Sequence, residues 1–294
     1  MNRVVITRDL AGGTVRVATA CGPRVETLFL GRTPASVLAL VPLVYNLCPA
    51  SHVAAARLAL GEPLAETASL DIAAETLREH AVMALRQWPC AVGHPVDRAA
   101  LAGLTTLTPA RLDALEAALF GASAEAVLAG DVRGRSVPAD ILRRVLSWPP
   151  LGRVPLAEDP TFVARNAHRP LVADHMPGGR VTLAARMVAS LMEAAAAILA
   201  LRTGTPPAGR IALTADAVRV EAPRGPLGHH ARVSGGSVTR YAVVTPTDRI
   251  LDRLEPILSA SLEAPPSIRA LAFDLTLATI DPCVAIEVRE AADA

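Results

Sequence analysis

A thiol and an imidazole lie close together near the end of a long apolar stretch. In Cys48-Pro49-Ala50-Ser51-His52 a cysteine comes four positions before a histidine, and Pro49 and Ser51 both favour the start of a helix there. Such a pair can supply a metal ligand with a nearby proton carrier. A buried structural cysteine beside a hydrogen-bonded histidine is the other interpretation that these residues leave open.

A second thiol lies close to the C-terminal end of the sequence, in Asp281-Pro282-Cys283. Pro282 fixes the backbone before the thiol, and Asp281 can accept hydrogen bonds beside it. A turn followed by a small buried residue would leave the same pattern. By themselves, these three residues favour that structural role.

An arginine is held between two prolines further upstream. Pro223 and Pro226 flank Arg224-Gly225, which sets the guanidinium at a fixed angle. Arginine is always charged and presents a rigid fork of donors, so it suits an anionic or π-acceptor ligand. Pairing with a surface carboxylate is the alternative. The histidines that follow, His229-His230, do not have the helical spacing of a metal motif, so we expect one of them to be structural.

Taken in order, these stretches resemble the signature motifs of the large subunit of nickel–iron hydrogenases. That family carries Arg-x-Cys-Gly-x-Cys-Pro-x-Ser-His, then Ala-Pro-Arg-Gly-x-Leu-Gly-His far downstream, and closes with Asp-Pro-Cys-x-x-Cys-x-x-His or Arg. The matching runs are Leu43–His52, Ala222–His229 and Asp281–Arg289. Glu26 also falls at the spacing of the family's early glutamate. The middle of the chain, from about 90 to 175, matches nothing in that family.

Two of the family's four nickel-binding thiolates are missing here. Tyr45 replaces the first cysteine and Ile286 the last, so that only Cys48, at a bridging position, and Cys283, at a terminal one, remain. Neither replacement can act as a soft thiolate toward nickel. The resemblance therefore implies no stable nickel centre, and we do not expect the chain to be an enzyme.

The resemblance also implies that the cofactor pocket is retained. Cys48 and Cys283 would bind iron, and Arg224 would donate a hydrogen bond to a cyanide nitrogen. The residues that match the family's pocket lining are Glu26, His52, Pro223, Arg224 and Asp281. A retained pocket with half of the ligands fits a protein that holds a metal fragment briefly and releases it.

This combination is similar to the hydrogenase expression and formation proteins, which look like shortened large subunits. The similarity implies an accessory scaffold in hydrogenase maturation that transiently holds iron with its cyanide and carbonyl ligands. The expected partners are the small HypC/HupF-like maturation chaperone that carries iron, and the large-subunit precursor. A metal-free mimic of the large subunit, which protects or regulates the maturation complex, is the alternative.

The patterns around the motifs predict an α+β fold, mainly helical, with small antiparallel β-hairpins. We expect an N-terminal hairpin turning at Gly12-Gly13, a second hairpin turning at Gly235-Gly236, and one small antiparallel sheet built from the N-terminal hairpin and residues 209–245. Long helices are predicted over 64–88, with Glu and Arg facing solvent, and over 181–202. A long irregular connection, rich in proline and glycine, is expected over about 149–180. One domain over 1–294 is expected, in which both ends of the chain pack together around a helical core like that of the hydrogenase large subunit.

Composition argues against several classes of protein. All 29 basic residues are arginines, and against 28 acidic residues they leave a net charge of +1, without the basic excess that nucleic-acid binding requires. The most apolar stretch, Leu183–Leu201, carries Arg186 and Glu193 and predicts a buried helix instead of a membrane span.

Cysteine usage predicts free thiols in the reducing cytoplasm, because the four cysteines show no close pairing. We expect Cys21 and Cys90 to be packing residues. His168, His175 and Asp174, in the proline-rich connection, are the components of a weaker alternative metal site at the surface.

Overall fold

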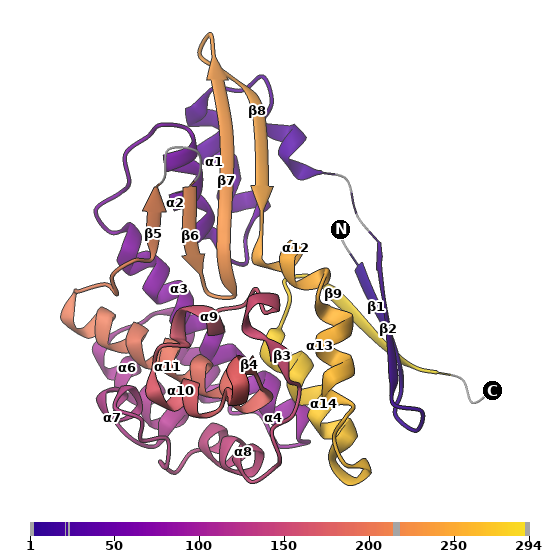
Figure 1. The fold of residues 1–294 in the computed structure, drawn as a ribbon. Coiled ribbons are helices and arrows are strands. Elements are labelled where there is room, and N and C mark those ends of the chain that lie inside the picture. The colour runs from indigo at the N-terminus through magenta and orange to yellow at the C-terminus, as the bar shows by residue number, and fades with distance from the viewer. Residues whose placement is uncertain (1–2, 21, 23, 214–217, 292–294) are drawn as a thin grey trace.

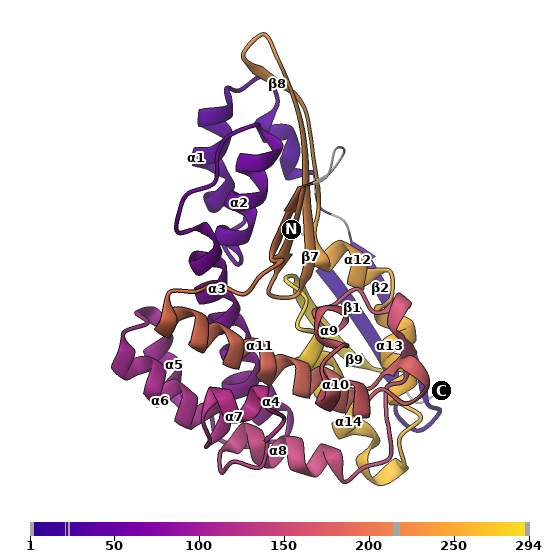
Figure 2. The ribbon, with the colours of Figure 1, turned by 60° about the vertical axis from the view of Figure 1, so that its left-hand side comes forward.

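The computed structural model describes residues 3–20, 22, 24–213 and 218–291. A helical body carries an upper lobe, in which a four-stranded sheet is backed by helices, and a three-stranded sheet lies to one side (Figures 1 and 2). The helices are α1 (Pro34–Val44), α2 (Pro49–Ala59), α3 (Ala68–Val82), α4 (Trp88–Ala91), α5 (Arg98–Ala102), α6 (Pro109–Phe120), α7 (Ala124–Leu128), α8 (Val137–Leu146), α9 (Val163–Asn166), α10 (Pro170–Asp174), α11 (Leu183–Thr203), α12 (Pro246–Leu251), α13 (Leu254–Ser261) and α14 (Pro266–Ile280). The strands are β1 (Arg3–Asp9), β2 (Thr14–Ala20), β3 (Val154–Pro155), β4 (Arg180–Val181), β5 (Ile211–Leu213), β6 (Val218–Ala222), β7 (Gly225–Ser234), β8 (Ser237–Val244) and β9 (Ala285–Glu290). The mainly helical α+β class is confirmed.

Helix α11 forms the centre of the helical body. The Thr182 hydroxyl caps its first turn by accepting from the Ala185 amide, and Gly204 ends it in the left-handed conformation. It is the one helix in the described chain that is long and apolar enough to cross a membrane, and its most apolar stretch is 83% buried inside the fold. This burial confirms the prediction of a core helix. The charge of Arg186 is tolerated inside because it pairs with the buried carboxylate of Asp159.

The predicted helix over 64–88 begins at Ala68 and is interrupted. Helix α3 passes through a π-helical turn at Met83–Gln87 into α4, a distortion that is frequent at functional sites. It packs along α11. The prediction that its acidic residues face solvent is wrong for Glu75, which is 5% exposed, because the helix is covered on more than one side.

Strands β5 to β8 form the antiparallel sheet of the upper lobe, in sequence order. Helix α2 packs against β6 and β7, and α1 packs against α2 (Figure 2). A small core forms here around Phe29, Val41 and Tyr241. Gly235-Gly236 makes the expected hairpin turn between β7 and β8, and both glycines have positive φ.

The two ends of the chain pack together, as expected. Strands β1 and β2 form the N-terminal hairpin, and β9 adds to β1 as a parallel strand, with Ile286 opposite Val4. The expectation of a single sheet is wrong: β9 occupies the free edge of β1, so this hairpin stays separate from β5–β8. Residues 149–180 are also more ordered than expected, because they include β3, β4, α9 and α10.

Candidate metal-binding site

Cys48 and Cys283 lie side by side, although they come from opposite ends of the sequence. Cys48 precedes α2 as its N-cap and is 8% exposed. Cys283 follows α14, is half-buried, and its amide donates to Thr247 Oγ1 at 3.2 Å. The two side chains are free thiols that share a hydrogen bond. Two sulfurs in such direct contact can bind one metal ion together.

The Arg224 guanidinium lies between Cys48 and two carboxylates. Its Nη1 is 3.7 Å from Cys48 Sγ and 2.5 Å from Glu79 Oε2. Its Nη2 donates to Asp281 Oδ2 at 2.6 Å, and its Nε donates to the Asp281 carbonyl. The side chain is 11% exposed. Contacts at every nitrogen hold the fork of donors rigid beside the Cys48 sulfur.

The turn between β6 and β7 aims Arg224 into the site. Gly225 has a φ of 145°, and a Cβ at this position would lie 2.5 Å from the Pro160 carbonyl oxygen, so a glycine is required. The Pro223 carbonyl accepts from Arg165 Nη2 at 3.1 Å and from His80 Nε2 at 3.2 Å. Buried side chains of the helical body thus fix the backbone just before the arginine.

Asp281 completes the support of the arginine. It ends α14 in the left-handed conformation, with a φ of 41°, which aspartate tolerates better than most residues. Its second carboxylate oxygen, Oδ1, accepts from Gln87 Nε2 at 3.2 Å. Because Gln87 belongs to the π-helical turn after α3, this distortion of the helix delivers a donor to the site.

The charges around the thiols favour one thiolate and one thiol. The hydrogen bond with Cys283, and then burial, raises the pKa of Cys48. The same hydrogen bond lowers the pKa of Cys283, and the positive charge of Arg224 adds to this effect. Burial opposes the charge of Arg224, but Cys283, Asp281 and Glu79 raise its pKa above the usual value. One fixed cation is therefore surrounded by several anionic groups, an arrangement that can accommodate additional positive charge.

A buried carboxylate from α3 fixes the end of the helix that carries Cys48. Glu75 accepts from the Ala50 amide at 2.7 Å, from the Ser51 amide at 3.2 Å and from the Ser51 hydroxyl. Burial raises the pKa of Glu75 to about 7, although these three hydrogen bonds act in the opposite direction. The bonds satisfy amide groups that the first turn of α2 leaves without helical partners.

His52 belongs to a buried aromatic cluster. Its Nδ1 is 2.9 Å from His229 Nε2, and His229 Nδ1 is 2.8 Å from the Tyr241 hydroxyl. The Tyr45 ring stacks on His52 with a centroid distance of 4.0 Å. Burial lowers the pKa of His52 to about 3 and that of His229 well below 6.5, so both rings are neutral. In the described part of the chain, the hydrogen bond of the His52 ring goes to His229 and not to a thiol.

The two residues that replace the missing thiolates are absorbed into packing. Tyr45 stacks in the aromatic cluster, and its buried hydroxyl has no hydrogen-bond partner among the described residues. Ile286 lies in β9 beside β1. Glu26, in the 3₁₀ turn Val25–Phe29, lies close enough for its charge to help raise the pKa of Tyr45, after burial. Glu26 therefore acts electrostatically on the residue that replaces the first thiolate.

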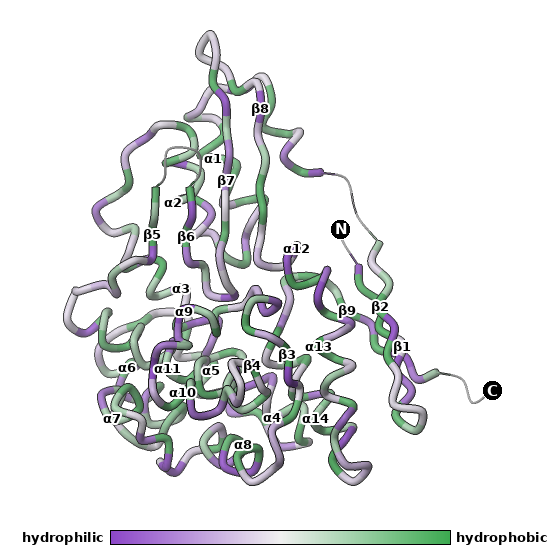
Figure 3. The backbone as a smooth tube through the Cα atoms, viewed as in Figure 1, coloured by the Kyte–Doolittle hydropathy of each residue, from purple (hydrophilic) through white to green (hydrophobic). Residues whose placement is uncertain are grey.

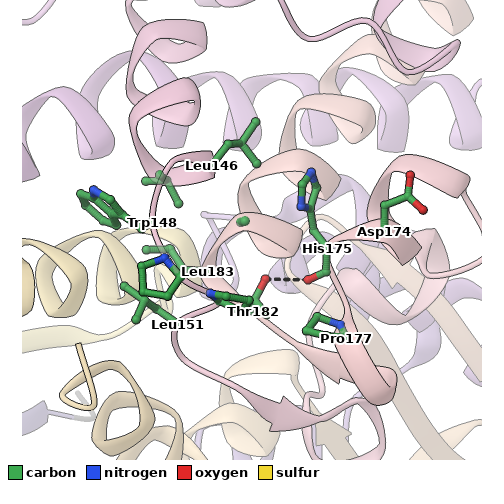
Figure 4. A pocket seen from close by; sticks show the side chains of 12 residues that line it. Leu146, Trp148, Leu151, Asp174, His175, Pro177, Thr182 and Leu183 are labelled. Carbon is green, nitrogen blue, oxygen red and sulfur yellow. Dashed lines mark hydrogen bonds between the residues drawn. The ribbon is translucent and has the colours of Figure 1, made fainter. Parts of the chain in front are cut away.

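Among the residues that the structure describes, no third side chain joins the two cysteines as a ligand. Within the described ranges, no group of three or more His, Cys, Asp or Glu side chains is placed to hold a metal ion. The alternative surface site at His168, His175 and Asp174 is therefore not assembled. Figure 4 shows His175 and Asp174 beside a small pocket of about 130 Å³, where Trp148 forms part of the apolar wall.

The remaining cysteines lie away from this pair or outside the described residues. Cys90 is exposed, so the expectation that it packs in the core is wrong. It follows Pro89 in the short helix α4, whose buried side is already occupied by Trp88 and Pro89. Cys21 falls outside the described residues.

Three residues of the site were not anticipated from the sequence, and all come from one helix and the π-helical turn that continues it. Glu75 holds the start of α2, Glu79 pairs with Arg224, and Gln87 pairs with Asp281. The i, i+4 spacing of Glu75 and Glu79 places both carboxylates on one face of α3 and was the available signal. That spacing is equally typical of a solvent-facing helix surface.

The arrangement of the chain is that of nickel–iron hydrogenase large subunits. It superposes on the NAD⁺-reducing [NiFe]-hydrogenase in the H₂-reduced state with a TM-score of 0.54 and 15% identity, covering 92% of both chains. On the Ni-Fe-Se hydrogenase from D. vulgaris Hildenborough the TM-score is 0.50 with 13% identity, covering 95% of this chain and 100% of that one. At these identities, the likeness shows the fold alone.

In sequence, no protein-family profile matches the chain. It is 31% identical over 281 residues to the hydrogenase expression/formation protein HupK of Rhodobacter capsulatus, covering 92% of this chain and 91% of that protein. The chain belongs to the HupK family of hydrogenase expression/formation proteins. The resemblance inferred from the three motifs is thereby confirmed.

Proposed function

We propose that this protein is an accessory scaffold in nickel–iron hydrogenase maturation, which transiently holds an iron ion carrying cyanide and carbonyl ligands. Membership of an expression/formation family supports a role in maturation. The observation that carries the finer proposal is the hydrogen-bonded pair Cys48 and Cys283 beside Arg224. Iron is the cargo of this site, which passes to the hydrogenase large subunit.

The donor set fits a fragment that brings most of its own ligands. Two thiolates suit a soft, thiolate-binding metal, and they leave room for diatomic ligands already bound to iron. They do not complete the four-thiolate set expected for nickel, because Tyr45 and Ile286 are packed into the cluster and the sheet. Few protein ligands also favour release over permanent retention.

Each residue of the site has a role in this proposal. Cys283, the more acidic thiol, offers the first sulfur, and Cys48 loses its proton when it becomes the second ligand. The Arg224 Nη1 beside Cys48 is placed to donate to an anionic ligand of the iron. Glu79 and Asp281 hold that guanidinium in position from opposite sides. The iron-carrying HypC/HupF-like chaperone and the large-subunit precursor are the proposed donor and acceptor, and the chain itself catalyses no hydrogen chemistry.

A metal-free mimic of the large subunit is the second candidate, and one observation favours it. The polar groups of the pocket have partners without a metal, because Glu79 and Asp281 neutralise Arg224 and the two free thiols share a hydrogen bond. In this case the protein would bind and protect or regulate the maturation complex. Its cysteines would be core residues.

Infrared spectroscopy separates the two candidates. The protein is purified without oxygen from a host that makes the other maturation factors, and the cyanide and carbonyl stretching region is recorded together with the iron content. We expect bands in the parent protein that are absent in Cys48→Ala and Cys283→Ala. The matched control is Cys90→Ala, which removes an exposed thiol and should leave the bands unchanged.

Three results would contradict the scaffold. A protein without bands and without iron would favour the metal-free mimic. Bands that persist in both cysteine variants would show that the fragment is held elsewhere. Stoichiometric nickel together with hydrogen uptake would instead identify an active hydrogenase subunit.

A further inference from the structure

The β7–β8 hairpin places two arginines directly opposite each other on an open sheet face. Arg232 pairs with Arg240 across the strands, next to the pair Ala231 and Tyr241. Because neighbouring residues of a strand point to opposite faces, the two arginines lie on the side away from buried Tyr241. Arg240 is exposed and Arg232 belongs to the exposed end of β7, and Figure 3 shows hydrophilic segments near the hairpin end of both strands.

This pair is unfavourable within the chain as it stands. Like charges directly opposite on adjacent strands destabilise a sheet, and among the described residues neither Arg232 nor Arg240 has an acidic partner. On the neighbouring strand β6 the situation differs, since Arg219 forms an ion pair with Glu221 at 2.6 Å. The sheet therefore keeps two uncompensated cations at its hairpin, where an external anionic group would relieve their repulsion.

A third arginine and exposed apolar side chains lie at the edge of the same hairpin. The Gly31 amide donates to the Val238 carbonyl at 2.8 Å, and the Val238 amide donates to the Arg32 carbonyl at 2.8 Å. This link brings Arg32, which is exposed and makes no ion pair within the described chain, to the edge of β8. Leu28 and Leu30, just before it, are 53% and 46% exposed.

We call the area formed by these residues the hairpin surface; it consists of Leu28, Leu30, Arg32, Arg232 and Arg240. Protein interfaces are enriched in arginine and combine apolar contacts with polar pairs at their rim.

We propose that the hairpin surface docks a protein partner whose contact area places carboxylates around an apolar centre. Guanidinium groups recognise carboxylates with paired hydrogen bonds, and the exposed leucines supply the apolar part of the contact. A nucleic acid or another phosphate-rich ligand would use the arginines alone and leave these leucines in water. The proposal rests on the proposed function only in expecting this partner among the maturation proteins.

Photocrosslinking in the living host tests the surface without requiring that the partner be identified first. A photoreactive amino acid replaces Leu28 in the full chain, expressed where hydrogenase is being made, and crosslinked products are identified by mass spectrometry. The control places the same amino acid at Arg111, an exposed position of α6 in the helical body, far from the hairpin (Figure 1). We expect one dominant protein product at position 28 that is absent at 111.

Charge reversal then tests the chemistry. Arg240→Glu should lower the yield of this product at least about tenfold, because the hairpin now presents an internal ion pair with Arg232. The thermal midpoint of Arg240→Glu should stay level or rise, since like charges become opposite charges across the strands, so misfolding cannot explain the loss. A product unchanged by Arg240→Glu, a product equally strong at position 111, or a nucleic-acid product overturns the proposal.

The failure of this proposal is distinguishable from failure of the scaffold function. Arg240→Glu leaves Cys48, Cys283 and Arg224 intact, so its isolated protein should still accept iron supplied by the chaperone in excess if the scaffold is correct. Loss of the crosslink with retained infrared bands supports both proposals. Absence of bands in every variant, together with a charge-dependent crosslink, refutes only the scaffold.

Discussion

The substitution Arg224→Met tests whether the guanidinium holds this site together. It removes the charge and all four contacts of the side chain, which reach Glu79, Cys48 and both the carboxylate and the carbonyl of Asp281. Methionine keeps much of the apolar stem and therefore limits the loss of packing. What remains is a pair of carboxylates that share no cation.

The expected cost follows from the burial of those carboxylates. Glu79 and Asp281 are 20% and 19% exposed, so water compensates them only in part. Removing one partner of a buried ion pair lowers the free energy of unfolding by about 3–5 kcal/mol. Because the two carboxylates remain partly exposed, we expect Arg224→Met to lie at the lower end, with a loss of about 3 kcal/mol. Arg224→Lys keeps the charge but not the fork and should cost about half as much.

The pH dependence gives a sharper signature. Burial already raises the pKa of Glu79, while Arg224 lowers it, so removal of the arginine raises it further. In the variant, the folded state then binds a proton that the unfolded chain releases at its ordinary, lower pKa. The loss of unfolding free energy relative to the parent protein is therefore largest above the raised pKa of Glu79. It shrinks as the pH falls toward the pKa of this group in the unfolded chain.

Urea unfolding at pH 8 and at pH 5.5 measures these losses of stability. The proteins compared are the parent, Arg224→Met, Glu79→Gln and the double variant. We expect the double variant to be more stable than the two single losses predict, because Glu79→Gln removes one of the orphaned charges. A loss below about 1 kcal/mol, or one that is the same at both pH values, would show that the arginine is not the electrostatic centre of the site.

Three further substitutions test the surroundings of the site. Burial lowers the pKa of His80 from 6.5 to about 3, so below pH 6.5 only the unfolded chain takes up this proton, and stability falls by about 1.4 kcal/mol per pH unit. His80→Gln should remove that slope between pH 6.5 and 4.5 in urea unfolding, and parallel curves would contradict the assignment. Tyr241→Phe leaves His229 Nδ1 without its 2.8 Å partner and should cost about 1–3 kcal/mol in the same assay, against no change if the hydroxyl is dispensable. Gly225→Ala places a Cβ 2.5 Å from the Pro160 carbonyl and strains a φ of 145°; we expect a loss above about 1 kcal/mol and weaker infrared bands, whereas full stability would show that the turn can relax.

Local patterns determined the parts of the fold that depend on neighbours in the sequence. The apolar stretch with Arg186 and Glu193 predicted a buried helix, which became α11. Alternating residues and Gly235-Gly236 predicted the β7–β8 hairpin. The loss of two thiolates at Tyr45 and Ile286 was also visible, because motif spacing survives in the sequence whatever the fold.

Only the tertiary structure decided how the site is supported and how the chain ends meet. Glu75 and Glu79 have the spacing of solvent-facing residues, and only the packing of α2 and of the turn carrying Arg224 against α3 turns them inward. Gln87 reaches Asp281 because a π-helical turn shifts its direction, which helical periodicity does not encode. Strand β9 pairs in parallel with β1 across nearly the whole chain length. Contacts of this kind depend on the free energy of the whole fold, so residue types in a local stretch do not specify them.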